Sequence, residues 1–150
     1  MLYYTHQETK GGNLMAAKTV NYLVLDTETA TLPFVNSMGL TPDQKKSVAI
    51  AKPLVYDIGW AIVNRAHGVV ERKNFLVAET FAVPAIFDTA YYHEKRPLYL
   101  EMLRRGEIRL LPWNDIIDIL IADIERCNYV CAYNAMFDFA KAIPFTELYI

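Results

Sequence analysis

Two β-rich segments joined by a short turn constrain the fold of this chain more than any other feature. Residues 55–64 (VYDIGWAIVN) and 69–78 (VVERKNFLVA) are rich in β-branched and aromatic side chains, and Arg65-Ala66-His67-Gly68 separates them. Two such runs around a short turn that contains glycine predict an antiparallel hairpin.

Two further segments predict the rest of the sheet. Residues 20–25 (VNYLVL) are mostly apolar and predict a central buried strand that ends at Asp26. Residues 129–132 (YVCA) predict a short buried strand. A hairpin beside a strand–helix–strand crossover implies an α/β fold with a mixed sheet and helices packed on it. Because no repeat or linker is visible, we expect one domain over residues 15–150.

Two helices are predicted between the hairpin and the last strand. Residues 91–105 are largely helical, with a break or kink at Pro97 and an end at Gly106. Residues 115–126 form the clearest helix, with acidic residues on one face. The apolar stripe of this second helix consists of Ile116, Ile117, Leu120, Ile121 and Ile124.

Composition excludes several classes of protein. Hydrophobic residues make up 53% of the 150 residues and charged residues 21%, which is typical of a folded globular chain. The formal net charge is −2, so no global basic field attracts nucleic acid, and a polyanion must be bound locally. Cys127 and Cys131 are too few for a disulfide scaffold, and we expect two reduced thiols in a cytoplasmic protein. No apolar run could span a bilayer, so we expect no membrane partner.

Residues 1–14 are polar and aperiodic, and a second methionine follows at Met15. They are either a short disordered arm or an extension from a mis-assigned start, with Met15 as the native first residue. The run Lys10-Gly11-Gly12 supports the second alternative, because the codons for these residues can have the nucleotide sequence of a ribosome-binding site.

Two carboxylates follow directly after the first strand. In extended backbone, residues two apart point to the same face, so Asp26 and Glu28 would be directed at one point beyond the strand end. Ligand sites in open α/β sheets lie at such strand ends. Paired carboxylates repel each other unless a cation neutralises them, and a hard divalent ion such as Mg²⁺ or Mn²⁺ fits. The alternative is that Asp26 only forms a turn or cap.

A third carboxylate follows the last strand. Asn134 is placed to cap a helix that begins at Ala135 and runs into Pro144. Asn134 and Asp138 are four residues apart and would share one helical face near the electropositive helix N-terminus. The alternative is a capped helix with an exposed Asp138.

Together the two segments resemble the first two motifs of the DEDD superfamily of 3′–5′ exonucleases. Asp-Thr-Glu-Thr-x-x-Leu-Pro at residues 26–33 resembles the first motif, and Asn-Ala-x-Phe-Asp at residues 134–138 resembles the second. The family's element order also matches that of residues 22–150. The resemblance implies an RNase H-like mixed sheet, in which a strand and an antiparallel hairpin are followed by a parallel strand, with flanking helices.

The resemblance also implies the chemistry. Two divalent ions, Mg²⁺ or Mn²⁺, would lie about 3.5–4 Å apart and support in-line hydrolysis at phosphorus. Asp26 would bridge both ions, Glu28 would bind the one that activates water, and Asp138 would contact the second. The substrate would be DNA or RNA with a free 3′ end, single-stranded, cut to nucleoside 5′-monophosphates. The residues that the resemblance places against this substrate are Thr27, Thr29, Leu32, Asn134 and Phe137.

Some features depart from the family pattern. Thr29-Ala30-Thr31 lacks the usual glycine after the first motif, and Tyr133 replaces a frequent histidine. The third motif, with a fourth carboxylate and a histidine or tyrosine that positions water, has no counterpart after Asp138, where Glu147 is the only acid. We therefore expect a chain that is incomplete at its C-terminus and has little or no activity. The alternative is a catalytically dead domain that binds nucleic acid or a protein partner.

Some other charged residues could either belong to the site or be ordinary solvated surface residues. Asp57 could approach the carboxylate site or be a solvated strand residue. The pairs Lys45-Lys46 and Arg104-Arg105 could contact phosphates or be solvated surface charges. A polymerase or another replication or repair partner is compatible with the resemblance, but the sequence identifies none.

Overall fold

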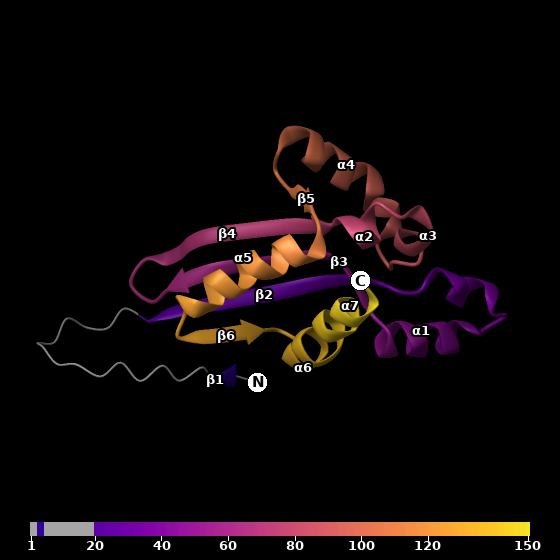
Figure 1. The fold of residues 1–150 in the computed structure, drawn as a ribbon, viewed down its shortest axis with the longest axis horizontal. Helices are drawn as coiled ribbons and strands as arrows, with labels where there is room; N and C mark the ends of the chain where they lie inside the picture. Colours follow the sequence, from indigo (N-terminus) through magenta and orange to yellow (C-terminus); the bar gives the residue numbers. More distant parts are fainter. Residues whose placement is uncertain (1–2, 5–19) are drawn as a thin grey trace, which may run out of the picture.

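A mixed sheet forms the centre of the computed structural model, which describes residues 3–4 and 20–150 (Figure 1). The strands are β1 (Tyr3–Tyr4), β2 (Asn21–Ala30), β3 (Leu54–Asn64), β4 (Gly68–Val77), β5 (Arg109–Leu111) and β6 (Tyr129–Ala132). Their order across the sheet is β1-β6-β2-β3-β4-β5. β3 and β4 form the predicted antiparallel hairpin, and β2 lies antiparallel to β3 and parallel to β6. The predicted α/β fold with a mixed sheet is confirmed.

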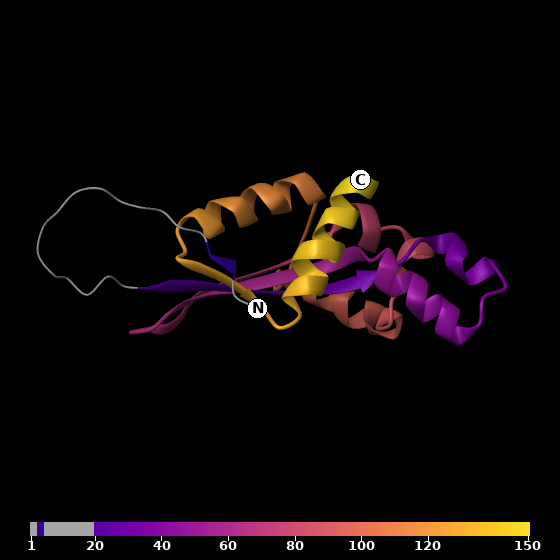
Figure 2. The ribbon, with the colours of Figure 1, turned by 90° about the horizontal axis from the view of Figure 1, so that it is seen from below.

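Helices cover the sheet on both sides. In Figure 2, α5 and α7 lie on one side of the sheet and α4 lies on the other. The helical segments before β5 are η1 (Pro33–Ser37), α1 (Pro42–Ala51), α2 (Ala78–Phe81), α3 (Pro84–Phe87), η2 (His93–Lys95) and α4 (Arg96–Arg105). Those after β5 are α5 (Trp113–Glu125), α6 (Ala135–Phe137), the π-helical turn η3 (Asp138–Ala142) and α7 (Ile143–Tyr149).

Two hydrophobic clusters fill the space between these layers. The first lies between the sheet and α5. The second packs α2, α3 and α4 against the first residues of β3 and the last residues of β4. The first includes Leu23, Leu25, Ile58, Trp60, Phe75, Trp113, Ile116, Leu120 and Val130. The second includes Leu54, Tyr56, Leu76, Phe81, Ile86, Phe87 and Ile108. Alternate residues of β2 and β3 therefore face α5, which leaves the residues between them on the opposite, open face.

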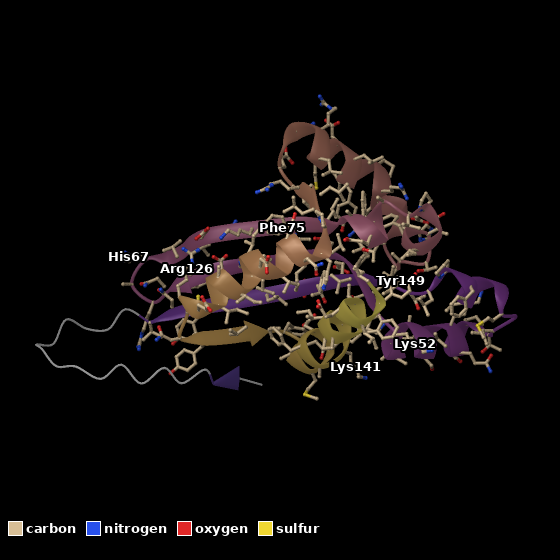
Figure 3. The ribbon with its side chains drawn as sticks, in the orientation of Figure 1. Lys52, His67, Phe75, Arg126, Lys141 and Tyr149 are labelled. Atoms are coloured by element: carbon tan, nitrogen blue, oxygen red, sulfur yellow. The ribbon has the colours of Figure 1, made fainter. Side chains whose placement is uncertain are left out.

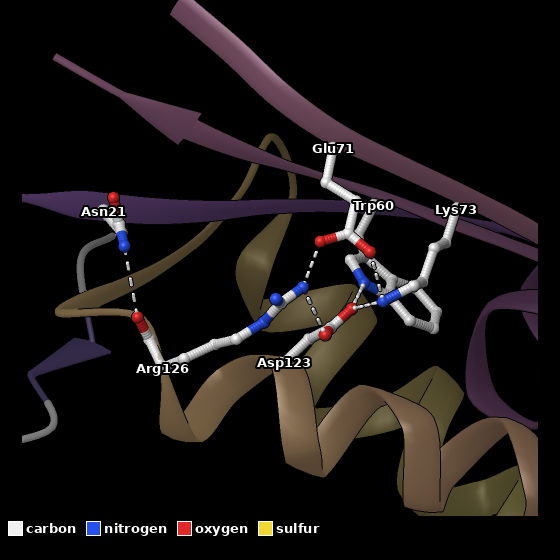
Figure 4. Close-up of polar contacts among 6 residues, drawn as sticks. All are labelled: Asn21, Trp60, Glu71, Lys73, Asp123 and Arg126. Atoms are coloured by element: carbon white, nitrogen blue, oxygen red, sulfur yellow. Dashed lines mark hydrogen bonds and ion pairs between the residues drawn. The ribbon is translucent and has the colours of Figure 1, made fainter. Parts of the chain in front are cut away.

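An ionic network holds α5 against the hairpin (Figure 4). Asp123 of α5 is 4% exposed, and its carboxylate accepts hydrogen bonds from Trp60 Nε1 at 2.7 Å and Lys73 Nζ at 2.6 Å. Arg126, at the end of α5 beside the hairpin (Figure 3), pairs with Asp123 at 2.8 Å and also with Glu71. Burial raises the pKa of Asp123, but the hydrogen bonds from Lys73 and Trp60 outweigh it and hold this pKa below its usual range.

Two predictions about the strands and helices need correction. β2 does not end at Asp26 but continues to Ala30, because it stays paired with β3 as far as Ala30 opposite Leu54. The apolar stripe of α5 is narrower than predicted, since Ile121 is 49% exposed. One of the acids of α5, Asp123, is buried, because the ionic network neutralises its charge.

Proline and asparagine also act differently from the prediction. Pro97 does not kink a helix but lies in the first turn of α4, where its missing N–H is not needed. Asn134 precedes α6 without a side-chain capping bond. The helix also does not end at Pro144, because the π-helical turn from Asp138 shifts the hydrogen-bond register just before it. Gly106 does end α4, with a left-handed φ of 71°.

The predicted arm or mis-assigned start, residues 1–14, lies outside the described residues apart from Tyr3–Tyr4, and so does Met15. Within the described residues, no helix is both long enough and apolar enough to cross a membrane.

We expect Asp123→Ala to lower the free energy of unfolding by about 2–3 kcal/mol, because charge-assisted hydrogen bonds to a buried carboxylate are lost. Urea titration at pH 7 measures this, and Asp118→Ala, an exposed acid of the same helix, should change stability by no more than about 0.5 kcal/mol. The pKa of Asp123 is lowered in the folded state, so its contribution is complete above the ordinary carboxyl pKa. The difference between wild type and Asp123→Ala should vanish as the pH falls through the lowered pKa. Equal losses in the two variants would contradict the role of the network.

Candidate functional site

Asp26 and Glu28 extend from the open face of β2. Leu25 on the same strand is buried towards α5, so the side chains before and after it face the opposite way. On the neighbouring strand, Gly59 lies opposite Asp26 and Asp57 lies opposite Glu28. The antiparallel register thus adds a carboxylate from β3 to the two that the sequence predicted.

Hydrogen bonds from two other elements hold the Asp57 carboxylate. Asn74 Nδ2 of β4 donates to Oδ1 at 2.8 Å, and Tyr99 Oη of α4 donates to Oδ2 at 2.9 Å. Asn74 reaches Asp57 by crossing over Gly59, where a Cβ atom would lie only 2.7 Å from Asn74 Nδ2. A glycine is therefore required at this position of β3 for the Asn74 side chain to stay in place.

Asp138 approaches β2 from the chain that follows β6. It begins the π-helical turn and is only 2% exposed. The hydroxyl of Thr27 donates to its Oδ1 at 2.6 Å. The other oxygen, Oδ2, is buried and accepts no hydrogen bond from the described residues.

Asp138 and the two acids of β2 approach from different faces of that strand. Thr27 lies between Asp26 and Glu28, so its side chain points to the opposite face. Its hydroxyl binds Asp138, which therefore also lies at that face. β6 pairs with β2 only as far as Leu25 opposite Ala132, so the strand edge beyond this pair carries no β6 residue.

Burial and repulsion between carboxylates raise the pKa of three acids at this end of the sheet. Burial, then repulsion from Asp26 and Asp57, raises the pKa of Glu28, and repulsion from Asp138 adds to it. Burial and repulsion from Asp26 raise the pKa of Asp138, against the hydrogen bond from Thr27. Burial also raises the pKa of Asp57, against its bonds to Asn74 and Tyr99. The positive charge of Lys95, which lies in η2, lowers the pKa of Glu28 and opposes the repulsion there.

A groove of about 690 Å³ runs along the open face of the sheet at Asp26, Glu28 and Asp57, and Asp138 does not line it. Its volume lies within the range of ligand sites in proteins. Tyr133, which follows β6, borders it and is fully exposed. The groove is lined by Val24, Leu25, Asp26, Glu28, Asp57, Gly59, Trp60, Ala61, Arg72, Lys73, Asn74, Tyr99, Glu107 and Tyr133.

The chemistry of these donors fits a hard divalent cation. Carboxylate oxygens are the ligands that Mg²⁺ and Mn²⁺ prefer, and a cation would relieve the repulsion that raises three of the pKa values. Asp26 and Glu28 on the open face and the unpaired Oδ2 of Asp138 are the groups that could hold it. These carboxylates are not yet close enough to surround one ion. Within residues 20–150, no three His, Cys, Asp or Glu side chains lie close enough to hold a metal ion together.

The predicted substrate-contacting residues are spread over different environments. Thr29 and Phe137 border a second hollow at the end of β2. Asn134 is exposed, whereas Leu32 is 8% exposed and belongs to the second hydrophobic cluster. Truncating Leu32 therefore removes core packing, in addition to any effect on a bound 3′ end.

Tyr99 and Asn74 are the site residues that the sequence did not reveal. Tyr99 lies 42 positions from Asp57 and Asn74 lies 17 positions from it, so no local motif links them. The one available signal was Gly59, a glycine inside a β-rich run, which often marks a close approach by another group. Asp57 itself was a candidate, and its position in the groove resolves the alternative of a solvated strand residue.

Glu147, the only acid after Asp138, lies away from this site. Its carboxylate accepts a hydrogen bond from Trp113 Nε1 at 2.5 Å and so joins α7 to the start of α5.

Comparison with known proteins adds no relative: no protein-family model, no curated protein and no solved structure matches the chain.

Proposed function

We propose that this chain carries the first two motifs of a metal-dependent 3′–5′ exonuclease for single-stranded DNA or RNA, and that its own activity is weak because the third motif has no counterpart after Asp138. The observation that carries the proposal is that three carboxylates lie at the same end of the parallel pair β2 and β6, with Asp26 and Glu28 on one face of β2 and Asp138 at the other. Burial and repulsion from Asp26 and Asp138 raise the pKa of Glu28, and burial and repulsion from Asp26 raise the pKa of Asp138. Proteins concentrate repelling carboxylates at functional sites more often than elsewhere. Such a site suits divalent cations and the phosphates that they bind.

The order of the strands supports the same assignment. A strand, an antiparallel hairpin and a later strand parallel to the first form the arrangement β4-β3-β2-β6. This is the order expected for the RNase H-like fold that the two motifs imply. Both motifs lie at the same end of the central parallel pair β2 and β6, where ligands of α/β sheets bind.

Each residue has a defined part in this proposal. Divalent ions, when bound, would supply a water nucleophile of lowered pKa and would stabilise negative charge on phosphate oxygens. Asp26 and Glu28 would hold ions on the open face. The Thr27 hydroxyl fixes Asp138 at the opposite face of the same strand end, where the unpaired Oδ2 could bind an ion. Asp57, fixed by Asn74 and Tyr99, is a fourth carboxylate from within the described residues. It comes from β3, whereas the family's third motif supplies its fourth carboxylate from the C-terminal part of the domain.

Divalent ions should stabilise the protein only where the carboxylates are ionised. The pKa values of Glu28, Asp57 and Asp138 are raised, so their favourable contribution to stability is complete below the ordinary carboxyl pKa of about 4 and is lost as the pH rises through the raised values. At pH 7.5, Mg²⁺ or Mn²⁺ at roughly 100 times its dissociation constant should add about 2.7 kcal/mol. That corresponds to about 5–10 °C in Tm for a chain of this size. At pH 4 the gain should be absent.

Two controls separate ion binding from general screening. KCl at equal ionic strength should not reproduce the shift in Tm. Asp138→Asn keeps an acceptor for Thr27 but removes one charge, so without divalent ions it should be at least as stable as wild type at pH 7.5. The same variant should lose most of the stabilisation by Mn²⁺, whereas Asp118→Asn should keep it. An unchanged Mn²⁺ response in Asp138→Asn would exclude Asp138 from the site.

Hydrolysis tests the activity directly. A single-stranded oligonucleotide labelled at its 5′ end and incubated with Mn²⁺ should be shortened slowly from the 3′ end, with release of nucleoside 5′-monophosphates, because the third motif has no counterpart after Asp138. Asp26→Ala should lower the rate by roughly 10²–10³-fold or more, because the carboxylate shared by the ions is lost. Asp118→Ala should match wild type. Equal degradation by wild type and Asp26→Ala would exclude the assigned site, and binding without any shortening would assign a binding domain instead of a nuclease.

A further inference from the structure

A second hollow, of about 420 Å³, lies at the end of β2, between α1 and α6. Figure 1 shows these two helices beside each other at that end of the sheet. The hollow is separate from the groove on the open face, since the two share no lining residue. It is lined by Thr29, Ala30, Thr31, Val35, Lys45, Lys46, Ala49, Ile50, Thr89, Tyr91 and Phe137.

The hollow adjoins the carboxylate site through the chain itself. Thr29 directly follows Glu28 in β2, and Phe137 directly precedes Asp138. Consecutive Cα atoms are about 3.8 Å apart, so the hollow begins within one residue of two of the carboxylates. A chain molecule whose phosphate lies at the carboxylates can therefore reach the hollow with its next unit.

Lys45 and Lys46 give this hollow the opposite charge. Both come from α1, and neither forms an ion pair with a carboxylate of the described residues. The other basic pair differs, because Arg104 and Arg105 each pair with Glu101 at 2.7 Å. Of the two clusters that the sequence left open, only Lys45-Lys46 keeps its charge available for a ligand.

Aromatic rings complete the lining. Tyr91 is 86% exposed, and Phe137 is half-buried at the start of the chain segment that carries Asp138. An exposed ring and a half-buried ring beside unpaired cations are a combination that binds single-stranded nucleic acid, through base stacking and phosphate contacts. A hollow of this volume is too small for a duplex and is of the size that holds one small ligand.

We propose that this hollow binds the part of a single nucleic-acid strand next to the scissile phosphate. Lys45 and Lys46 pair with its backbone phosphates, and Tyr91 and Phe137 offer ring faces to its bases. The inference rests on the proposed exonuclease function and adds the residues that hold the substrate. It also explains how phosphates are held near a cluster of acids that would otherwise repel them.

The test compares two variants that each lose two positive charges, Lys45→Gln/Lys46→Gln and Arg104→Gln/Arg105→Gln. Binding of a fluorescent single-stranded oligothymidylate is measured by anisotropy in Ca²⁺ over a series of KCl concentrations. Each phosphate contact on a single strand contributes about 0.7 to the slope of log Kd against log salt, so the lysine variant should lose up to about 1.4. Its Kd at 0.1 M salt should rise roughly tenfold to thirtyfold. The arginine variant should stay within about twofold of wild type, because its charges are already paired.

A further variant tests the aromatic contact. Tyr91→Ala, at an exposed position, should weaken binding at least about fivefold and leave the salt slope unchanged, since stacking releases no counterions. Far-UV circular dichroism and Tm should be the same for all variants, which excludes unfolding as the cause.

The outcomes distinguish this inference from the proposed function. Equal salt slopes and Kd values for the lysine and arginine variants would overturn the binding hollow. If wild type shortens the oligonucleotide in Mn²⁺ while the lysine variant keeps its KM, the hollow is wrong and the exonuclease function stands. If wild type neither binds nor shortens the oligonucleotide, both are wrong. A raised KM with a nearly unchanged kcat in the lysine variant would support both.

Discussion

The antiparallel pairing of β2 with β3 is the constraint on which the candidate site depends. It sets Glu28 directly opposite Asp57, and just beyond this pair β3 carries one extra residue, Tyr56, so the register shifts between Glu28 and Thr29. Bulges of this kind re-direct side chains and are frequent beside active sites. Here the bulge marks the end of the open face with its acids. After it, β2 continues with Thr29 into the lining of the second hollow.

The packing around this pair keeps groups together that repel one another. Burial and like charges raise the pKa of both Glu28 and Asp57, so in the absence of a cation the ionised site opposes folding. The hydrophobic clusters on the two faces of the sheet supply the compensating stability, and Asn74 and Tyr99 fix the Asp57 carboxylate in place. A local arrangement that is unfavourable and yet held this firmly is typical of a functional site.

Local patterns in the sequence predicted local structure, and contacts between distant residues remained out of reach. The hairpin and the strand at residues 129–132 followed from β-rich runs and turn residues, because those signals act within a few positions. The carboxylates of the two motifs were also identifiable from the sequence. The partners of Asp57 were not, since pairing register and the docking of α4 decide them. For the same reason the sequence did not reveal that Asp123 is buried, since its cationic partners come from β4 and from the end of its own helix.

In the proposed function, the groove and the hollow beside the end of β2 would resolve the difficulty that a net charge of −2 poses for binding a polyanion. A polyanion gains nothing from the field of such a protein as a whole, so its binding must rely on local charge. At this end of the sheet the acids around Glu28 suit divalent ions, and the unpaired Lys45 and Lys46 next to them suit phosphates. In the proposed function, bound ions would turn the acidic groove into a positive site beside the basic hollow. Nucleic acid would then be attracted only when the ions are present, which makes the metal a condition for substrate binding as well as for hydrolysis.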